Sequence, residues 1–182
     1  MHTRPTSDRV REALFSMLAS RGAVESANVL DLYAGTGALG LEALSRGAAR
    51  ATFVESDRRA LEALHRNIAA LREGHRTRVV PLPAARALAQ LRDESFSLVL
   101  CDPPYAEVAS GGASAVLSQT LPSLAAAAIV VLEHATRDAT PQCVGLRHIE
   151  TRTYGDTSLA FYETSASGAR EANGSGAREA AT

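Results

Sequence analysis

Short apolar runs alternate along the sequence with longer stretches in which apolar residues recur at every third or fourth position. The short runs are typical of buried strands, and the wider spacing is typical of amphipathic helices. Because the two kinds of segment alternate, the sequence predicts an α/β fold with a mainly parallel, doubly wound sheet covered by helices on both faces. We expect strands at 28–32, 51–55, 78–82, 97–101 and 128–133, and helices at about 38–45, 58–71, 84–91 and 113–124.

A further helix is expected ahead of the first strand. Its apolar residues recur at helical spacing up to about Ser20, and Gly22 ends the pattern. Ser7 or Asp8 can serve as its N-cap, because short polar side chains satisfy the free N–H groups of a first turn.

The end of the chain contains two late segments, 144–150 and 158–163, that predict a closing hairpin. The hairpin would complete a seven-stranded sheet with an antiparallel edge strand. The remainder, 164–182, is rich in Ser, Gly and Ala and holds a near-repeat of Gly-Ala-Arg-Glu-Ala, so we expect a disordered low-complexity tail. We therefore expect one domain over 1–163, with an amino-terminal helix region at 1–22.

Composition narrows the class of protein. Of the 182 residues, 46% are hydrophobic and 21% are charged, which fits a globular domain. The 19 basic and 20 acidic residues give a net charge of −1, so any nucleic-acid site must be a local patch. Every basic residue is arginine, which can make forked contacts with phosphate. The two cysteines and five histidines lack metal-ligand spacing, and the apolar runs are shorter than the roughly 20 residues that span a bilayer. We expect a cytoplasmic protein without metal or membrane contact.

A glycine-rich turn follows the first predicted strand. Residues 35–40 read G-T-G-A-L-G, and Glu55 stands at the end of the second strand. This is the context of a dinucleotide site, so an NAD(P)-dependent oxidoreductase is one interpretation, and a ligand-free tight turn is another. Asp31, just before the turn, instead suits a cationic ligand such as S-adenosylmethionine (SAM). Glu55 can accept hydrogen bonds from both ribose hydroxyls of that ligand.

The segment Asp102-Pro103-Pro104-Tyr105 comes directly after the fourth predicted strand. Two prolines fix the backbone and withhold N–H donors, so the Asp102 carboxylate and the Pro103 carbonyl are left as acceptors. Tyr105 offers a ring on which a planar base can stack. Acceptors that hold the hydrogens of an aromatic amine help its nitrogen to attack a sulfonium methyl group. The other interpretation is a proline-stiffened loop with Tyr105 as a packing residue.

These motifs together resemble one family of class I SAM-dependent methyltransferases. The stretches RPTSDRVREALF at 4–15, DLYAGTGALGLEA at 31–43 and YGDTSL at 154–159, with Asp-Pro-Pro-Tyr, are similar to the RsmD family. That resemblance spans residue 4 to about 162. It implies a Rossmann-like fold and transfer of a methyl group from SAM to N2 of a guanine in 16S ribosomal RNA, with S-adenosylhomocysteine as the second product.

Carried over residue by residue, the resemblance also implies roles for single positions. Thr6 and the start of the first helix would close over the cofactor, and the target guanine would be flipped out to reach its site. The partner would be 16S rRNA, within the small ribosomal subunit, with no obligate protein partner. The implied cofactor residues are Thr6, Asp31, Ala34, Gly35, Gly37, Glu55 and Ser56; the implied catalytic residues are Asp102, Pro103, Pro104 and Tyr105; the implied RNA-binding residues are Arg4, Arg9 and Arg11.

Two positions depart from the family pattern. Relatives carry a further basic segment ahead of Arg-Pro-Thr, whereas Met1 is three residues before Arg4, which bears on RNA affinity. Pro83 stands where relatives place an acid or amide that contacts adenine, so we expect weaker cofactor binding.

Other functions remain open at this point. One is the oxidoreductase, and another is a non-catalytic RNA-binding or assembly protein that keeps the fold. A third keeps the chemistry but acts on DNA adenine or on a protein glutamine.

Overall fold

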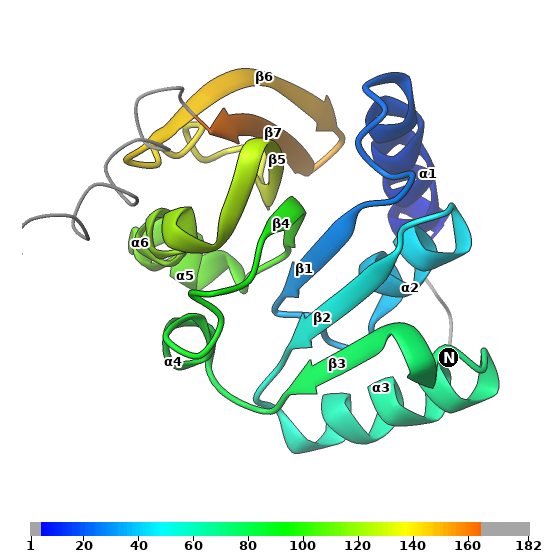
Figure 1. Cartoon of the computed structure of the whole chain (residues 1–182). Helices are drawn as coiled ribbons and strands as arrows, with labels where there is room; N and C mark the ends of the chain where they lie inside the picture. Colours follow the sequence, from blue (N-terminus) through cyan, green and yellow to red (C-terminus); the bar gives the residue numbers. More distant parts are fainter. Residues whose placement is uncertain (1–4, 165–182) are drawn as a thin grey trace, which may run out of the picture.

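The computed structural model describes residues 5–164 and consists of one seven-stranded sheet with helices on both faces (Figure 1). The strands are β1 (Asn28–Leu32), β2 (Arg50–Val54), β3 (Thr77–Val80), β4 (Phe96–Cys101), β5 (Leu124–Ala135), β6 (Leu146–Tyr154) and β7 (Thr157–Thr164). The helices are α1 (Pro5–Ser20), α2 (Ala38–Ser45), α3 (Arg58–Ala70), α4 (Ala84–Leu88), α5 (Tyr105–Ala109) and α6 (Gly112–Gln119), with 3-10 turns at Gly74–Arg76 and Leu121–Ser123.

The strand order is β3-β2-β1-β4-β5-β7-β6. Strands β1 to β5 pair in parallel, and β7 runs antiparallel to both of its neighbours, β5 and β6. The predicted fold class is therefore confirmed, with the antiparallel strand one place in from the edge. The order reverses between β1 and β4, where Leu32 lies beside Cys101. In open α/β sheets such a reversal leaves a crevice at the carboxyl ends of the strands, and ligands bind there.

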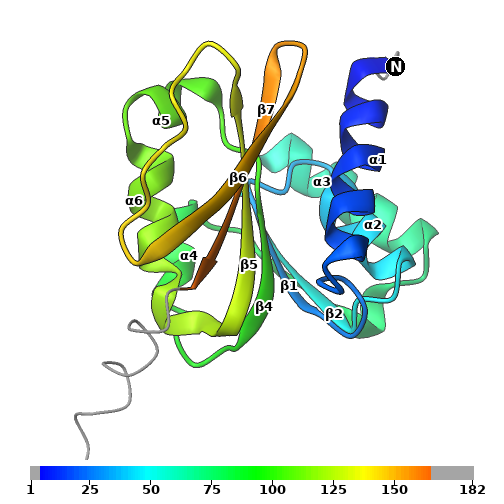
Figure 2. The same ribbon diagram turned by 90° about the horizontal axis from the view of Figure 1, so that it is seen from above.

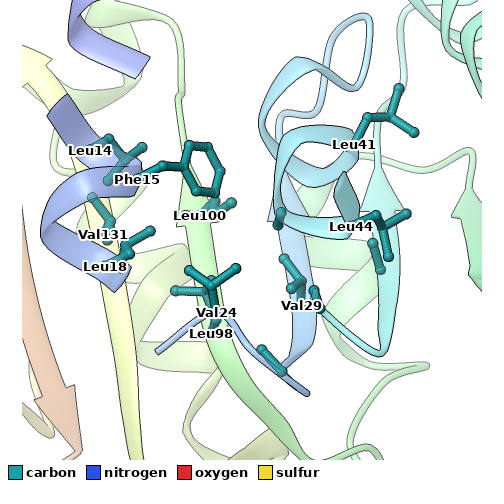
Figure 3. Close-up of a cluster of buried hydrophobic side chains, with 14 of the residues drawn as sticks. Leu14, Phe15, Leu18, Val24, Val29, Leu41, Leu44, Leu98, Leu100 and Val131 are labelled. Carbon is teal, nitrogen blue, oxygen red and sulfur yellow. The ribbon is translucent and has the colours of Figure 1, made fainter. Parts of the chain in front are cut away.

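Helices α1, α2 and α3 cover one face of the sheet, and α4, α5 and α6 cover the other (Figure 2). On the first face, Leu14, Phe15 and Leu18 of α1 pack against Leu100 and Val131 (Figure 3). These side chains are almost completely buried, and each stabilises the fold by about 1.5–3 kcal/mol through loss of apolar surface from water. The amino-terminal helix is thus part of the domain core.

Most predicted elements agree with the structure to within a few residues, and α1 is one difference. It already includes Pro5, so neither Ser7 nor Asp8 is its N-cap. Proline suits a first helical turn because the N–H that it lacks has no partner there. The Asp8 carboxylate instead accepts a hydrogen bond from Arg11 at 3.0 Å.

Helix α6, strand β6, strand β5 and helix α5 are the other differences. Helix α6 ends at Gln119, where the prediction extended to about 124, and β6 continues to Tyr154, where the prediction ended at 150. The strand predicted at 128–133 extends from Leu124 to Ala135, with an irregularity at Ala127, whose φ is 59°. Helix α5 was not predicted, because it is short and lies between a Pro-Pro pair and a Gly-Gly pair that both read as loop. The predicted tail lies outside the described residues apart from Thr164, which ends β7.

Within residues 5–164, none of the helices has both the length and the apolar character to cross a bilayer.

Gly40, in the first turn of α2, marks a close approach between that helix and β2. A Cβ atom placed there would lie 2.4 Å from Cε1 of Phe53 and 3.0 Å from Oδ2 of Asp31. The Phe53 ring is fully buried, so it has little room to move away. The glycine is therefore required for the helix to pack on the sheet.

We expect Gly40→Ala to lower the free energy of unfolding by about 1–3 kcal/mol, because the added methyl group overpacks the core. Denaturant titration measures the change. Gly74→Ala is the matched control, since a Cβ atom there meets nothing within 4 Å, and it should change stability by less than about 1 kcal/mol. Equal losses in the two variants would contradict this account of Gly40.

Candidate cofactor and substrate site

The glycine turn between β1 and α2 is held by hydrogen bonds to side chains from other parts of the chain. The Gly35 N–H donates to Oε2 of Glu55 at 2.8 Å. Asn67 of α3 donates from Nδ2 to the Thr36 carbonyl at 2.9 Å. Gly35 and Gly37 have φ values of 55° and 83°, which only glycine adopts without strain. The turn therefore has a fixed shape before any ligand binds.

Glu55 links this turn to the end of β2. While Oε2 accepts from Gly35, Oε1 accepts the N–H groups of Ser56 and Asp57, both at 2.7 Å. A carboxylate has about four acceptor sites, so three backbone bonds leave it able to accept from a ligand hydroxyl.

Asp31 lies beneath the turn. Its side chain is 1% exposed, and Oδ2 accepts the Gly40 N–H at 2.9 Å. Burial raises the pKa of Asp31 to about 7, with smaller contributions from the charges of Asp102 and Glu55, while the hydrogen bond from Gly40 acts in the opposite direction. The structure thus places Asp31 as a support of the turn and the start of α2, away from open space.

A cavity of about 750 Å³ opens at the carboxyl ends of the parallel strands. This volume falls within the range of roughly 300–1,000 Å³ that small-molecule and cofactor sites occupy. One wall is acidic and polar, and another is apolar. The lining residues are Tyr33, Val54, Glu55, Ser56, Asp57, Leu82, Pro83, Ala84, Ala85, Asp102, Pro103, Pro104, Tyr105, Glu107, Val116 and Glu133.

The Asp-Pro-Pro-Tyr segment forms the side of this cavity nearest the strand reversal. The Asp102 N–H donates to the Leu32 carbonyl at 3.4 Å, which continues the β1–β4 pairing to the edge of the sheet. The Asp102 carboxyl faces the cavity, and its partial burial there raises its pKa. Tyr105 begins α5 and leaves 43% of its side chain exposed. An acceptor and a free aromatic ring are thus presented side by side.

A second cavity, of about 540 Å³, adjoins the first on the side of α1 and the β6–β7 turn. Val10, Arg11 and Leu14 of α1 form one wall, and residues 155–157 form another. Asp102, Tyr105 and Glu133 line both cavities. These three side chains therefore stand where the two spaces meet.

The structure brings together some of the predicted site residues and separates others. Those that line the larger cavity are Glu55, Ser56, Asp102, Pro103, Pro104 and Tyr105. Those in or beneath the turn, outside the cavity lining, are Asp31, Ala34, Gly35 and Gly37.

Of the predicted site residues near the amino terminus, the structure describes the side chains of Arg9 and Arg11. Arg11 lines the smaller cavity and pairs with Asp8, while Arg9 is exposed on α1. Thr6 belongs to α1, and its side chain is outside what the structure describes, as is the whole of Arg4.

Sequence reasoning missed Tyr33, Glu107 and Glu133. The Tyr33 hydroxyl donates to Oε2 of Glu107 at 2.5 Å, which ties the end of β1 to α5, and burial raises the Tyr33 pKa. The sequence pattern does not mark Glu107, because the Pro-Pro and Gly-Gly pairs around α5 predict a loop there. Glu133 ends the predicted fifth strand, so the rule that singled out Glu55 and Asp102 applied to it as well.

Across residues 5–164, no group of three or more His, Cys, Asp or Glu side chains is arranged to hold a metal ion.

Comparison with known proteins places this geometry in a family. A family model described as "Conserved hypothetical protein 95" matches residues 1–163. Ribosomal RNA small subunit methyltransferase D of Escherichia coli is 49% identical over 102 residues, which cover 56% of this chain and 50% of that protein. The chain thus spans about half the length of that relative. YlbH of Bacillus subtilis, provisionally named as an rRNA methyltransferase, is 34% identical over 164 residues, with 88% of each chain covered.

Solved structures agree with this placement. The structure of yhhF from Escherichia coli, provisionally described as a methyltransferase, superimposes with a TM-score of 0.76 at 36% identity, covering 90% of this chain and 88% of that one. Magnesium protoporphyrin IX methyltransferase from Synechocystis, solved with bound SAM, has a TM-score of 0.64 at 17% identity, covering 88% and 80% of the two chains, which shows a shared fold alone. With a family model matched over nearly all of the described residues, and the strand order and Asp-Pro-Pro-Tyr segment in place, the chain belongs to the RsmD family.

Proposed function

We propose that this chain is a SAM-dependent methyltransferase that modifies the N2 amine of a guanine in 16S ribosomal RNA. The observation that carries the proposal is the Asp-Pro-Pro-Tyr segment, which stands at the strand reversal where two cavities meet. One cavity can take the cofactor, and the other can take a base. The RsmD-family membership and the name of the Escherichia coli relative support the substrate.

The larger cavity fits SAM by the chemistry of its walls. Glu55 is held at one end with acceptor capacity left for ribose hydroxyls. Leu82, Pro83 and Ala84 form an apolar surface suited to an adenine ring, without a side-chain acceptor for its amino group. When bound, SAM supplies an electrophilic methyl group on a sulfonium centre. The backbone of the glycine turn would lie against the cofactor, and it is shaped by Asp31, Ala34, Gly35 and Gly37. Thr6 and Ser56 would contact the cofactor directly.

Asp102 and Pro103 would orient the attacking amine. An aromatic amine is a weak nucleophile because its lone pair is delocalised into the ring. The Asp102 carboxylate and the Pro103 carbonyl would accept its two hydrogens, which favours a pyramidal nitrogen whose lone pair points at the methyl group. Tyr105 would stack on the base and fix its plane. Catalysis of this kind depends on positioning and electrostatics.

The RNA would approach over α1. Arg9 is exposed there, and Arg11 lies at the rim of the smaller cavity. With a net charge of −1 for the whole chain, these arginines, with Arg4, would form the local patch that phosphate requires. A base must leave its stack to reach Asp102, and a loop guanine does so at the lowest cost. The assembled small subunit as substrate is part of the same proposal.

We expect Asp102→Ala to slow methyl transfer by about 100- to 1,000-fold, because one of the two acceptors for the amine is lost. SAM affinity should change by less than about threefold, since the cofactor contacts lie elsewhere in the cavity. Labelled methyl incorporation into small subunits that lack the modification measures the rate, and calorimetry measures the affinity.

Asp93→Ala, in an exposed turn, is the control for Asp102→Ala and should keep full activity. If the unmutated protein binds SAM but methylates no RNA, a non-catalytic RNA-binding role replaces this proposal. If it binds a nicotinamide cofactor in place of SAM, the oxidoreductase interpretation replaces it.

We expect Pro83→Asp to tighten SAM binding by about 2- to 10-fold, because a carboxylate there can accept from the adenine amino group. Pro83 is also the N-cap of α4 and lacks a side-chain cap, so aspartate should raise stability as well. Pro81→Asp is the matched control, since Pro81 is exposed outside the cavity lining. Unchanged affinity for Pro83→Asp would place the adenine elsewhere.

We expect methyl transfer to fall as the pH is lowered, and to do so at a higher pH than an ordinary aspartate would give. Ionised Asp102 is the acceptor of the amine hydrogens, and burial raises its pKa, so it is protonated at a higher pH than an ordinary aspartate. Burial and the charge of Asp102 raise the pKa of the neighbouring Glu133 to about 7. A profile of kcat/KM from pH 5 to 9 measures the effect, and constant activity down to pH 5 would contradict it.

A further inference from the structure

Glu133 lies near the carboxyl end of β5, beside the Asp-Pro-Pro-Tyr segment. Strands β4 and β5 are parallel, with Cys101 paired to Leu132. Asp102 directly follows β4, and Glu133 is the next residue of β5, so the register brings their carboxyl groups to the same level at the edge of the sheet. Both side chains line the larger and the smaller cavity.

The Glu133 carboxylate lacks a donor of its own. Within residues 5–164 no group donates a hydrogen bond to it and no arginine or histidine forms an ion pair with it. Its side chain is nevertheless half-buried. Burial and the charge of Asp102 raise the pKa of Glu133 to about 7. A carboxylate in such a place is costly unless donors reach it, and the donors must come from what enters the cavity.

Guanine is the base whose edge matches two adjacent acceptors. Its N1–H and its N2 amino group are neighbouring donors that point in the same direction. Adenine and cytosine place an acceptor nitrogen beside their amino groups, so a second carboxylate would face a lone pair. A site that holds one amino group with Asp102 and adds a second acceptor therefore selects guanine.

We propose that Glu133 is the residue that recognises guanine, by accepting the N1–H of the base while Asp102 accepts a hydrogen of its N2 amine. This inference rests on the proposed function and assigns the choice of base to β5. Tyr105 lines both cavities beside the two acids and would hold the ring in the plane that they share.

The test uses 2-aminopurine, which keeps the N2 amine but carries a lone pair at N1 in place of N1–H. Ligated 16S RNA with guanosine or 2-aminopurine at the target position is assembled into small subunits, and labelled methyl incorporation is followed. The unmutated protein should prefer guanosine by about 10- to 100-fold, the loss expected when a hydrogen bond to a charged group is missing.

Glu133→Gln should reverse this preference at least in part. The glutamine amide can donate to the N1 lone pair of 2-aminopurine, so that substrate should gain activity while guanosine loses about 10-fold or more. SAM affinity, measured by calorimetry, should stay within about threefold. Glu62→Gln, in an exposed position on α3 paired with Arg58, is the matched control and should behave as the unmutated protein.

Four results would overturn the inference. An unchanged preference in Glu133→Gln would remove Glu133 from base recognition, and a large loss of SAM affinity would assign it to the cofactor; neither outcome affects the proposed function. If the unmutated protein methylates neither substrate, the proposed function fails and this inference fails with it.

Should Glu133→Gln not fold, as judged by thermal melting, Glu133→Asp is used. The shorter carboxylate should slow guanosine methylation yet still reject 2-aminopurine, and loss of that rejection would contradict the inference.

Discussion

Parallel pairing of β1 to β5 forces carboxylates from distant parts of the chain toward one edge of the sheet. Asp31, Glu55, Asp102 and Glu133 belong to four of these strands or directly follow them. Like charges so close together repel, and burial raises the pKa of Asp31, Asp102 and Glu133. An edge of this kind favours a cationic cofactor and a substrate rich in hydrogen-bond donors, and it disfavours a pyrophosphate.

The four carboxylates have different roles because they differ in burial and in hydrogen-bond partners. Asp31 is closed off from solvent and bonded to Gly40, so it fixes where α2 begins. Glu55 makes three backbone bonds and fixes the glycine turn. Asp102 faces both cavities, and the acid beside it on β5 does the same. Two of the acids therefore build the site, and the other two are free to meet what enters it.

The positions of the strands along the chain were predictable because apolar runs mark buried strands directly, whereas the order β3-β2-β1-β4-β5-β7-β6 is known from the structure. The ends of β2 and β4 could be located as well, and with them Glu55 and Asp102. The burial of the Asp31 side chain beneath the turn could not be predicted, since the sequence pattern does not show in which direction a carboxylate points. That burial depends on Gly40, which has no Cβ atom and so leaves room for both Phe53 and the Asp31 carboxylate.

Other parts of the site depend on contacts between segments that no local pattern records. Tyr33 adopts a φ of 60° and reaches across to Glu107 on a helix too short to predict. The level of Glu133 beside Asp102 follows from the β4–β5 register, which is shifted by the irregularity near Leu98. Residues like these become visible only when the strands are paired.

The central claim is that this acidic edge brings the amine of a guanine to the cofactor. Identification of the methylated nucleoside tests it most directly. Small subunits that lack the modification are incubated with the protein and SAM, and the digested RNA is analysed by mass spectrometry. The account predicts N2-methylguanosine as the single new nucleoside. N6-methyladenosine, or a methyl group on another atom of guanine, would contradict it.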